Sequence, residues 1–291
     1  MRTGVVILPD LPWPQARSRW LEAEARGFAT GWTYDHLSWR SLRDGPWLGT
    51  VPLLGAVAAV TSRIRFGTLV TSPNFRHPAV LAKDVMTLDR LSDGRFDLGV
   101  GAGGVGFDAV ALGADPLGPA DRAARFAEFV STLDLLLREQ SATVAGEFFT
   151  AIDSRTIPGC VQRPRVPFTV AAAGPKALAV AASQAQTWVT FGPVKPAESS
   201  QQWFDAVAGQ TQTLDAACLA IGREPTSIRR LALVGLELGW AQESIGGWQD
   251  FTGQLAELGF TDVALHWPRP EDRELPGPAM SVFDEVSARL G

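Results

Sequence analysis

The sequence predicts one α/β domain over residues 1–291, folded as a (β/α)8 TIM barrel. Strand patterns alternate with helical patterns eight times along the chain. Residues 64–106 hold one complete strand, turn, helix and strand, which run directly into a glycine-rich loop. The 291 residues, 46% of them hydrophobic, can bury a large core, as a barrel requires.

The expected elements follow one another from the first residues to the last. Strands are expected at residues 4–8, 31–34, 64–71, 95–100, 167–171, 187–190, 229–236 and 261–265. Helices are expected at residues 14–26, 49–62, 78–92, 121–139, 175–183, 199–221, 244–258 and 278–290. Local signals support the bounds, since Pro78 opens the third helix and Asp93-Gly94 ends it.

Two longer segments interrupt the alternation. They are insertions at residues 101–120, after the fourth strand, and 140–165, before the fifth, with a short hairpin expected at 144–152. In a barrel the first insertion lies on the catalytic face, where the loops after the strands gather. An open doubly wound sheet is the alternative, but Leu8 is followed by Pro9-Asp10-Leu11-Pro12 and not by the Gly-x-Gly-x-x-Gly of that fold.

Composition argues against several classes of function. The net charge is -5, from interleaved basic and acidic residues, so we expect no nucleic-acid partner. The two cysteines and three histidines are too dispersed for a metal site. No apolar run approaches the roughly 18 residues that a membrane helix needs, so we expect no membrane partner and a cytoplasmic location.

Asp35 and His36 end the second expected strand and therefore face the C-terminal mouth of the barrel. Such a pair can donate or accept a proton next to a bound ring, because histidine titrates near neutrality and a neighbouring carboxylate adjusts it. The alternative is a capped turn in which Asp35 accepts hydrogen bonds from backbone amides. His77, before Pro78, is expected to cap its helix.

Two loops are candidates for a phosphorylated ligand. The glycines after the fourth strand let a flat or phosphorylated molecule approach the backbone closely. The segment from Ala173 to Ala177 opens a helix, whose free amides and dipole, with Lys176, favour an anion. An ordinary strand-to-helix turn is the alternative for this segment. Together the loops predict a long phosphorylated ligand across the mouth.

The chain has ten tryptophans and one tyrosine. Five tryptophans fall near strand ends or loops and could line an apolar substrate pocket. These are Trp13, Trp32, Trp39, Trp47 and Trp267. Three others, Trp20, Trp188 and Trp203, lie within expected helices or strands and are interpreted as core residues.

Four segments resemble the bacterial luciferase-like superfamily, and within it the branch that uses the deazaflavin coenzyme F420. They are GWTYDHL at 31–37, FGTLVTSPNFRHP at 66–78, LDRLSDGRFDLGVGAGGVGFD at 88–108 and AAAGPKAL at 171–178. The resemblance spans the chain to about residue 192, and the block at 88–108 with the strand and helix before it is its most specific part.

The resemblance implies a barrel that binds a flavin-type cofactor at its C-terminal mouth, with a non-proline cis peptide at Leu69-Val70 behind the ring. The implied catalytic residues are His36 and Asp35. The implied cofactor-binding residues are Asp35, Thr68, Leu69, Val70, Thr71, Gly101, Gly103, Gly104, Ala173, Gly174, Pro175, Lys176 and Ala177.

Three functions remain open at this stage. The first is an F420-dependent oxidoreductase that transfers hydride to or from a C=C, C=N or C=O bond of a small-molecule substrate. The second is an FMN-dependent monooxygenase, supplied with reduced flavin by a separate reductase. The third is a phosphate-binding aldolase or isomerase without a redox cofactor. Relatives of the resembling family often pair, so a homodimer is expected.

Overall fold

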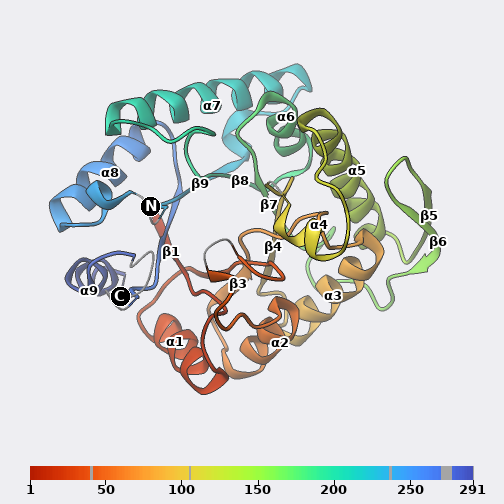
Figure 1. The fold of residues 1–291 in the computed structure, drawn as a ribbon, viewed down its shortest axis with the longest axis horizontal. Helices are drawn as coiled ribbons and strands as arrows, with labels where there is room; N and C mark the ends of the chain where they lie inside the picture. Colours follow the sequence, from red (N-terminus) through yellow and green to blue (C-terminus); the bar gives the residue numbers. More distant parts are fainter. Residues whose placement is uncertain (40–41, 105, 236–237, 270–276, 291) are drawn as a thin grey trace.

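Eight parallel strands close into a barrel surrounded by helices (Figure 1). The structure is a computed structural model and describes residues 1–39, 42–104, 106–235, 238–269 and 277–290. Around the barrel the strand order is β1-β10-β9-β8-β7-β4-β3-β2. The (β/α)8 prediction is therefore confirmed.

The strands are short and buried on both faces, as parallel barrel strands are. The barrel strands are β1 (Arg2–Val6), β2 (Thr30–Thr33), β3 (Arg65–Thr68), β4 (Phe96–Gly101), β7 (Phe168–Ala171), β8 (Thr187–Thr190), β9 (Arg229–Leu233) and β10 (Asp262–His266). A separate antiparallel hairpin is formed by β5 (Ser141–Ala145) and β6 (Thr150–Arg155). It lies outside the helix ring beside α5 (Figure 1).

The α-helices lie on the outer side of the barrel, except for α4. They are α1 (Trp13–Ala25), α2 (Thr50–Val60), α3 (Pro78–Leu91), α4 (Phe107–Ala111), α5 (Pro119–Arg138), α6 (Pro175–Gln184), α7 (Ser200–Ala220), α8 (Ile245–Glu257) and α9 (Met280–Ala288). Among the described residues, none of the helices has the length and apolar character needed to cross a membrane.

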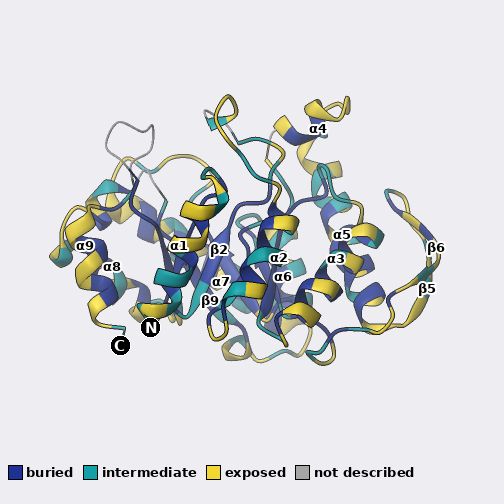
Figure 2. Ribbon diagram, turned by 90° about the horizontal axis from the view of Figure 1, so that it is seen from below, coloured by how far each residue is buried: buried dark blue, intermediate teal, exposed yellow. Residues whose placement is uncertain are grey.

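The carboxyl ends of the strands form a mouth at one end of the barrel. Figure 2 shows α4 projecting from that end and both chain termini near the opposite end. Neighbouring strands are in parallel register, with Gly101 of β4 opposite Ala171 of β7. Loops that follow neighbouring strands therefore begin side by side at the mouth.

The structure differs from the expected elements in the two insertions and at the ends of several strands. Helix α4 within residues 101–120 was not expected, and the hairpin extends beyond 144–152 at both ends. The third strand ends at Thr68; the cis peptide bond Leu69-Val70 follows it, and Thr71 then forms an isolated bridge to Val100. The first and seventh barrel strands end at Val6 and Leu233, before the expected residues 8 and 236, and residue 236 lies outside the described residues.

Strands β3 and β4 approach so closely that glycine is required between them. A Cβ atom on Gly67 would overlap the carbonyl oxygen of Asp97, and one on Gly99 would overlap the carbonyl oxygen of Thr68. Both strands are buried at these positions. The backbone path that leads to the mouth at Leu69 therefore depends on two positions that carry no side chain.

Charged side chains fix the loops at the end opposite the mouth. The carboxylate of Glu24 accepts backbone hydrogen bonds from Ser62, Arg63 and Ile64 at 2.6–3.0 Å. Arg65 donates two hydrogen bonds to the buried carboxylate of Asp97, at 2.9 and 2.8 Å. These groups are engaged in the fold and face away from the mouth.

The core has two parts. Most buried apolar side chains pack between barrel and helices, and a smaller cluster fills the barrel interior. Trp20, Trp188 and Trp203 are almost fully buried in the larger part, which confirms their interpretation as core residues.

We predict that Gly99→Ala lowers the free energy of unfolding by about 3 kcal/mol, because the new methyl group displaces the backbone of β3. Gly55→Ala is the matched control. Gly55 lies inside α2 and has open space around it, so alanine should raise stability by roughly 0.5–1 kcal/mol. Urea unfolding of both variants measures the difference, and similar effects from the two changes would contradict the close approach of the strands.

Candidate active site

Asp35 lies at the mouth just beyond β2 and forms a bidentate ion pair with Arg76. The Nε and Nη2 atoms of Arg76 donate to its two carboxylate oxygens at 3.0 and 2.7 Å. Asp35 is 1% exposed. Burial lowers the pKa of Arg76, but the hydrogen bonds and charge of Asp35 outweigh it, so that the pKa is raised. The pair joins the loop after β2 to the loop after β3.

His36 has a different carboxylate as its partner. Its Nδ1 lies 2.7 Å from Oδ2 of Asp108, the second residue of α4, and Oδ1 of the same carboxylate accepts the backbone N–H of Leu37 at 2.8 Å. The indole of Trp47 donates to the carbonyl of His36 at 2.9 Å. His36 is thus held by its ring and by its backbone.

Asp35 and His36 therefore do not act on each other as their adjacency suggests. Successive side chains leave the chain in different directions, and each of these two meets a partner from another loop. The alternative of a turn in which Asp35 is bonded to backbone amides is not what the structure shows either, because its two oxygens contact a guanidinium.

The predicted cis peptide bond is present at Leu69-Val70. Leu69 is buried in the interior cluster, with Val70 packed against it. The hydroxyl of Thr68 is already engaged, because it donates to the carbonyl of Gly99 at 2.8 Å. The hydroxyl of Thr71 is fully buried and has no hydrogen-bond partner among the described residues. It is an orphaned polar group at the mouth.

The glycine loop after β4 lies against this segment. A Cβ on Gly101 would come within 2.7 Å of the Val70 side chain, and one on Gly103, which has a φ of +73°, would collide with Asn74. Gly104 has open space where a side chain would be. The loop is therefore packed tightly at Gly101 and Gly103 and faces open space at Gly104, where a ligand can approach the backbone closely.

The segment Ala173–Ala177 follows β7, the neighbour of β4 in the barrel. Gly174 is the N-cap of α6 and supplies no capping side chain, while Pro175 occupies the first turn. The amides of Lys176 and Ala177 are thus left for an anion. The side chain of Lys176 is exposed. The predicted site residues come from the ends of β2, β3, β4 and β7, four consecutive strands of the barrel.

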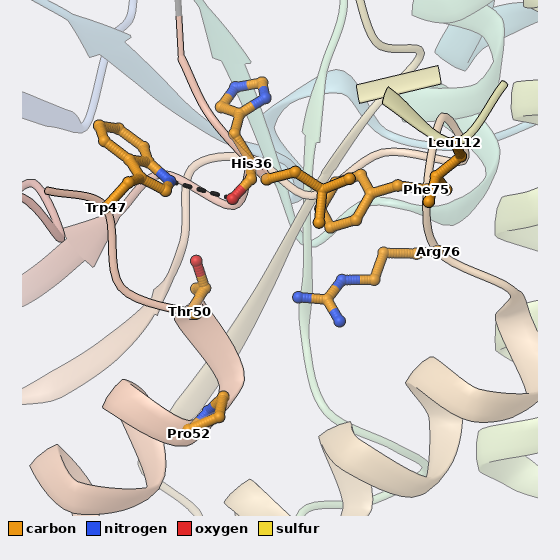
Figure 3. A pocket seen from close by; sticks show the side chains of 9 residues that line it. His36, Trp47, Thr50, Pro52, Phe75, Arg76 and Leu112 are labelled. Atoms are coloured by element: carbon orange, nitrogen blue, oxygen red, sulfur yellow. Dashed lines mark hydrogen bonds between the residues drawn. The ribbon is translucent and has the colours of Figure 1, made fainter. Parts of the chain in front are cut away.

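A cavity of about 320 Å³ lies between the loops after β2 and β3. Figure 3 shows the side chains around it. It is lined by His36, Leu37, Trp47, Gly49, Thr50, Pro52, Phe75, Arg76 and Leu112. The glycine loop and the Leu69-Val70 bond are not part of this lining, so the cavity adjoins the predicted cofactor loops without including them.

A second histidine lies inside the barrel mouth. His266 ends β10, and its Nε2 lies 2.8 Å from the hydroxyl of Tyr34 while Nδ1 lies 3.2 Å from the carbonyl of Val234. A carbonyl only accepts, so Nδ1 carries the proton and Nε2 accepts from Tyr34. Burial, aided by the nearby charge of Arg269, lowers the pKa of His266 from 6.5 to about 4.

The prediction that five tryptophans near strand ends line an apolar pocket is correct in part. Trp47 lines the cavity and stacks on Trp39, and Trp32 lies in the interior cluster. Trp267 and Trp13 instead pack on the outer part of the core, with Trp267 against Phe283. The loop after β1 and the end of β10 direct these two rings outward, away from the mouth.

The sequence profile described as luciferase-like monooxygenase matches residues 1–236. The chain belongs to this family. The match includes the four segments that carry the resemblance. It extends to residue 236, whereas the resemblance read from the sequence ended at about residue 192.

Three similar proteins illustrate the range of this luciferase-like family. An F420-dependent glucose-6-phosphate dehydrogenase of Beutenbergia cavernae is 38% identical over 163 residues, 55% of this chain and 47% of the relative. A 4-hydroxyprotoasukamycin monooxygenase of Streptomyces nodosus subsp. asukaensis is 31% identical over 77% of this chain and 63% of its own length. This chain thus spans about half to two thirds of these curated relatives.

The third is a solved structure, the coenzyme F420-dependent tetrahydromethanopterin reductase of Methanopyrus kandleri. It superposes with a TM-score of 0.75 and 17% identity over 99% of this chain and 96% of its own. This likeness concerns the fold of the luciferase-like barrel.

Sequence reasoning missed two residues that organise the site. Arg76 stands next to His77, which caps α3 through its Nδ1 as expected. Asp108 is the last residue of the resembling block. For Arg76 the only signal was its position just before an expected helix, and for Asp108 its place in the resembling block. Their partners lie 41 and 72 residues away.

We predict that His266 makes the protein less stable in acid. The unfolded chain binds a proton at pH 6.5 and the folded chain only near 4, so stability present above 6.5 is lost as the pH falls between these values, by about 3 kcal/mol. The difference in free energy of unfolding between wild type and His266→Gln should shrink by that amount between pH 7.5 and 4. A constant difference for His266→Gln would refute the buried neutral state.

Proposed function

We propose that this protein is an F420-dependent oxidoreductase, which transfers hydride between the deazaflavin and a small organic substrate. One observation carries the proposal: a positioned histidine after β2, the apolar segment of Leu69 and Val70 after β3 and a narrow glycine loop after β4 meet at one mouth. The curated relatives named for F420-dependent activity support it.

The residues at the mouth fit the cofactor. The buried hydroxyl of Thr71 lacks a partner and offers a hydrogen bond to a bound group. Leu69 and Val70 provide an apolar surface for a ring, and the loop from Gly101 to Gly104 admits the chain that follows it. The free amides at the start of α6 suit its phosphate.

F420, when bound, supplies or accepts a hydride at its ring. The chain itself handles the proton that accompanies this transfer, and His36 is the residue for that task, because its ring is 26% exposed and its Nδ1 is fixed. The buried ion pair of Asp35 with Arg76 holds the loop that carries His36. The apolar side chains of the mouth keep water from the reacting atoms.

An FMN-dependent monooxygenase is the second candidate. The Streptomyces relative is named as a monooxygenase and matches a larger share of this chain than the dehydrogenases do. A separate reductase would then supply reduced flavin. The aldolase or isomerase has less support, because Lys83, Lys176 and Lys195 are all exposed and none has the desolvated setting of a Schiff-base lysine.

Titration of the purified protein with oxidised F420 and, separately, with FMN tests the choice of cofactor. We expect F420 to bind with the lower Kd, followed by its absorbance or fluorescence. Tight binding of FMN without binding of F420 would favour the monooxygenase. Failure to bind either, with affinity for sugar phosphates, would revive the aldolase or isomerase.

We predict that His36→Ala lowers kcat by roughly 100-fold or more and changes the Kd for F420 by less than about threefold. The substrate for this assay is found first, by screening alcohols and sugar phosphates, glucose 6-phosphate included, for loss of oxidised F420 absorbance. His77→Ala is the control and should retain wild-type turnover. Equal losses of turnover and cofactor affinity in His36→Ala would argue against a chemical role.

A further inference from the structure

We propose that Asp108 is the positioning residue of His36, and that its carboxylate keeps the imidazole proton on Nδ1 so that Nε2 is the proton acceptor at the mouth. The role of Nε2 as a proton acceptor in catalysis rests on the proposed function. The tautomer itself is a property of the chain without cofactor or substrate.

The contact has the geometry of a strong hydrogen bond. Oδ2 of Asp108 lies 2.7 Å from Nδ1 of His36, within the range of charge-assisted bonds. The other oxygen accepts the N–H of Leu37 at 2.8 Å. The carboxylate therefore spans the ring of His36 and the next backbone amide, which fixes the ring relative to its own main chain.

The chemistry of the carboxylate determines the tautomer. An ionised carboxylate has no proton to donate, so a short contact with neutral imidazole requires the hydrogen on Nδ1. Nε2 then has a lone pair, and none of the hydrogen bonds found among the described residues involves it. This nitrogen accepts a proton from a ligand, and Asp108 stabilises the imidazolium that results.

Burial separates the tasks of the two groups. The side chain of Asp108 is 4% exposed and that of His36 is 26% exposed, so the ring is the part that a ligand can reach. Asp35 cannot replace Asp108, since Arg76 occupies both of its oxygens. The partner of His36 comes from α4, in the insertion after β4, and not from its own strand.

The tautomer can be read directly by ¹⁵N NMR of protein labelled in the histidine rings. The chain has three histidines, so His36→Gln and His77→Gln assign all three imidazoles. The neutral imidazole of wild-type His36 should carry its proton on Nδ1. A wild-type spectrum with the proton on Nε2 overturns the proposal without any Asp108 variant.

Asp108→Asn should move the proton. The amide oxygen is needed by the N–H of Leu37, so the NH2 group faces Nδ1, which must then accept. We expect the His36 signals to switch to the Nε2–H form. Asp108→Glu keeps two acceptor oxygens and should retain the Nδ1–H form. Asp115→Asn, at an exposed position in the same insertion, is the control. An unchanged tautomer in folded Asp108→Asn refutes the positioning role.

Measurements of turnover distinguish a failure of this proposal from a failure of the proposed function. With the substrate found by the screen, Asp108→Asn should lower kcat by roughly 100-fold while the Kd for F420 changes by less than about threefold. Asp108→Glu should recover much of the loss. If the tautomer switches but kcat is unchanged, Asp108 does position the ring, and the chemical role of His36 in the proposed function is wrong.

Discussion

The site depends on the close approach of β3 and β4, where there is no room for side chains. Gly67 and Gly99 let each backbone touch a carbonyl oxygen of the other strand. Past this contact β3 ends and the cis bond Leu69-Val70 follows, with Gly101 fitted against Val70. The apolar surface of Leu69 and Val70 and the glycine loop therefore pack directly against each other, and a shift of one would displace the other.

The barrel brings strand ends together but does not choose partners for their side chains. Three polar groups of the mouth are each fixed by a residue from another loop or strand: Asp35 by Arg76, His36 by Asp108 and His266 by Tyr34. The three pairs have distinct electrostatic states, namely a bidentate ion pair, a histidine with a carboxylate and a neutral histidine with a phenol. Two neighbouring residues, Asp35 and His36, therefore serve different purposes.

Periodicity and glycine positions were enough to predict the barrel, because alternating elements of these lengths have few ways to bury their apolar faces. They also placed His36 and the glycine loop at the mouth. The partners of Asp35 and His36 could not be predicted, since contacts between loops depend on side-chain directions that no local pattern encodes. Helix α4 was missed because five residues are too few to show a period. Trp267 shows the same limit, since its place at a strand end did not reveal that it turns outward.

Helix α4 is too short to be stable by itself, and Asp108 is one of its two buried residues. Its bond to His36 therefore links two equilibria, the docking of α4 on the mouth and the choice of imidazole tautomer. Such linkage is reciprocal: the free energy by which docked α4 favours the proton on Nδ1 equals that by which this tautomer favours docking. A ligand that stabilises docked α4 therefore also favours the tautomer in which Nε2 is the proton acceptor. In return, a ligand that donates a hydrogen bond to Nε2 favours the docked helix.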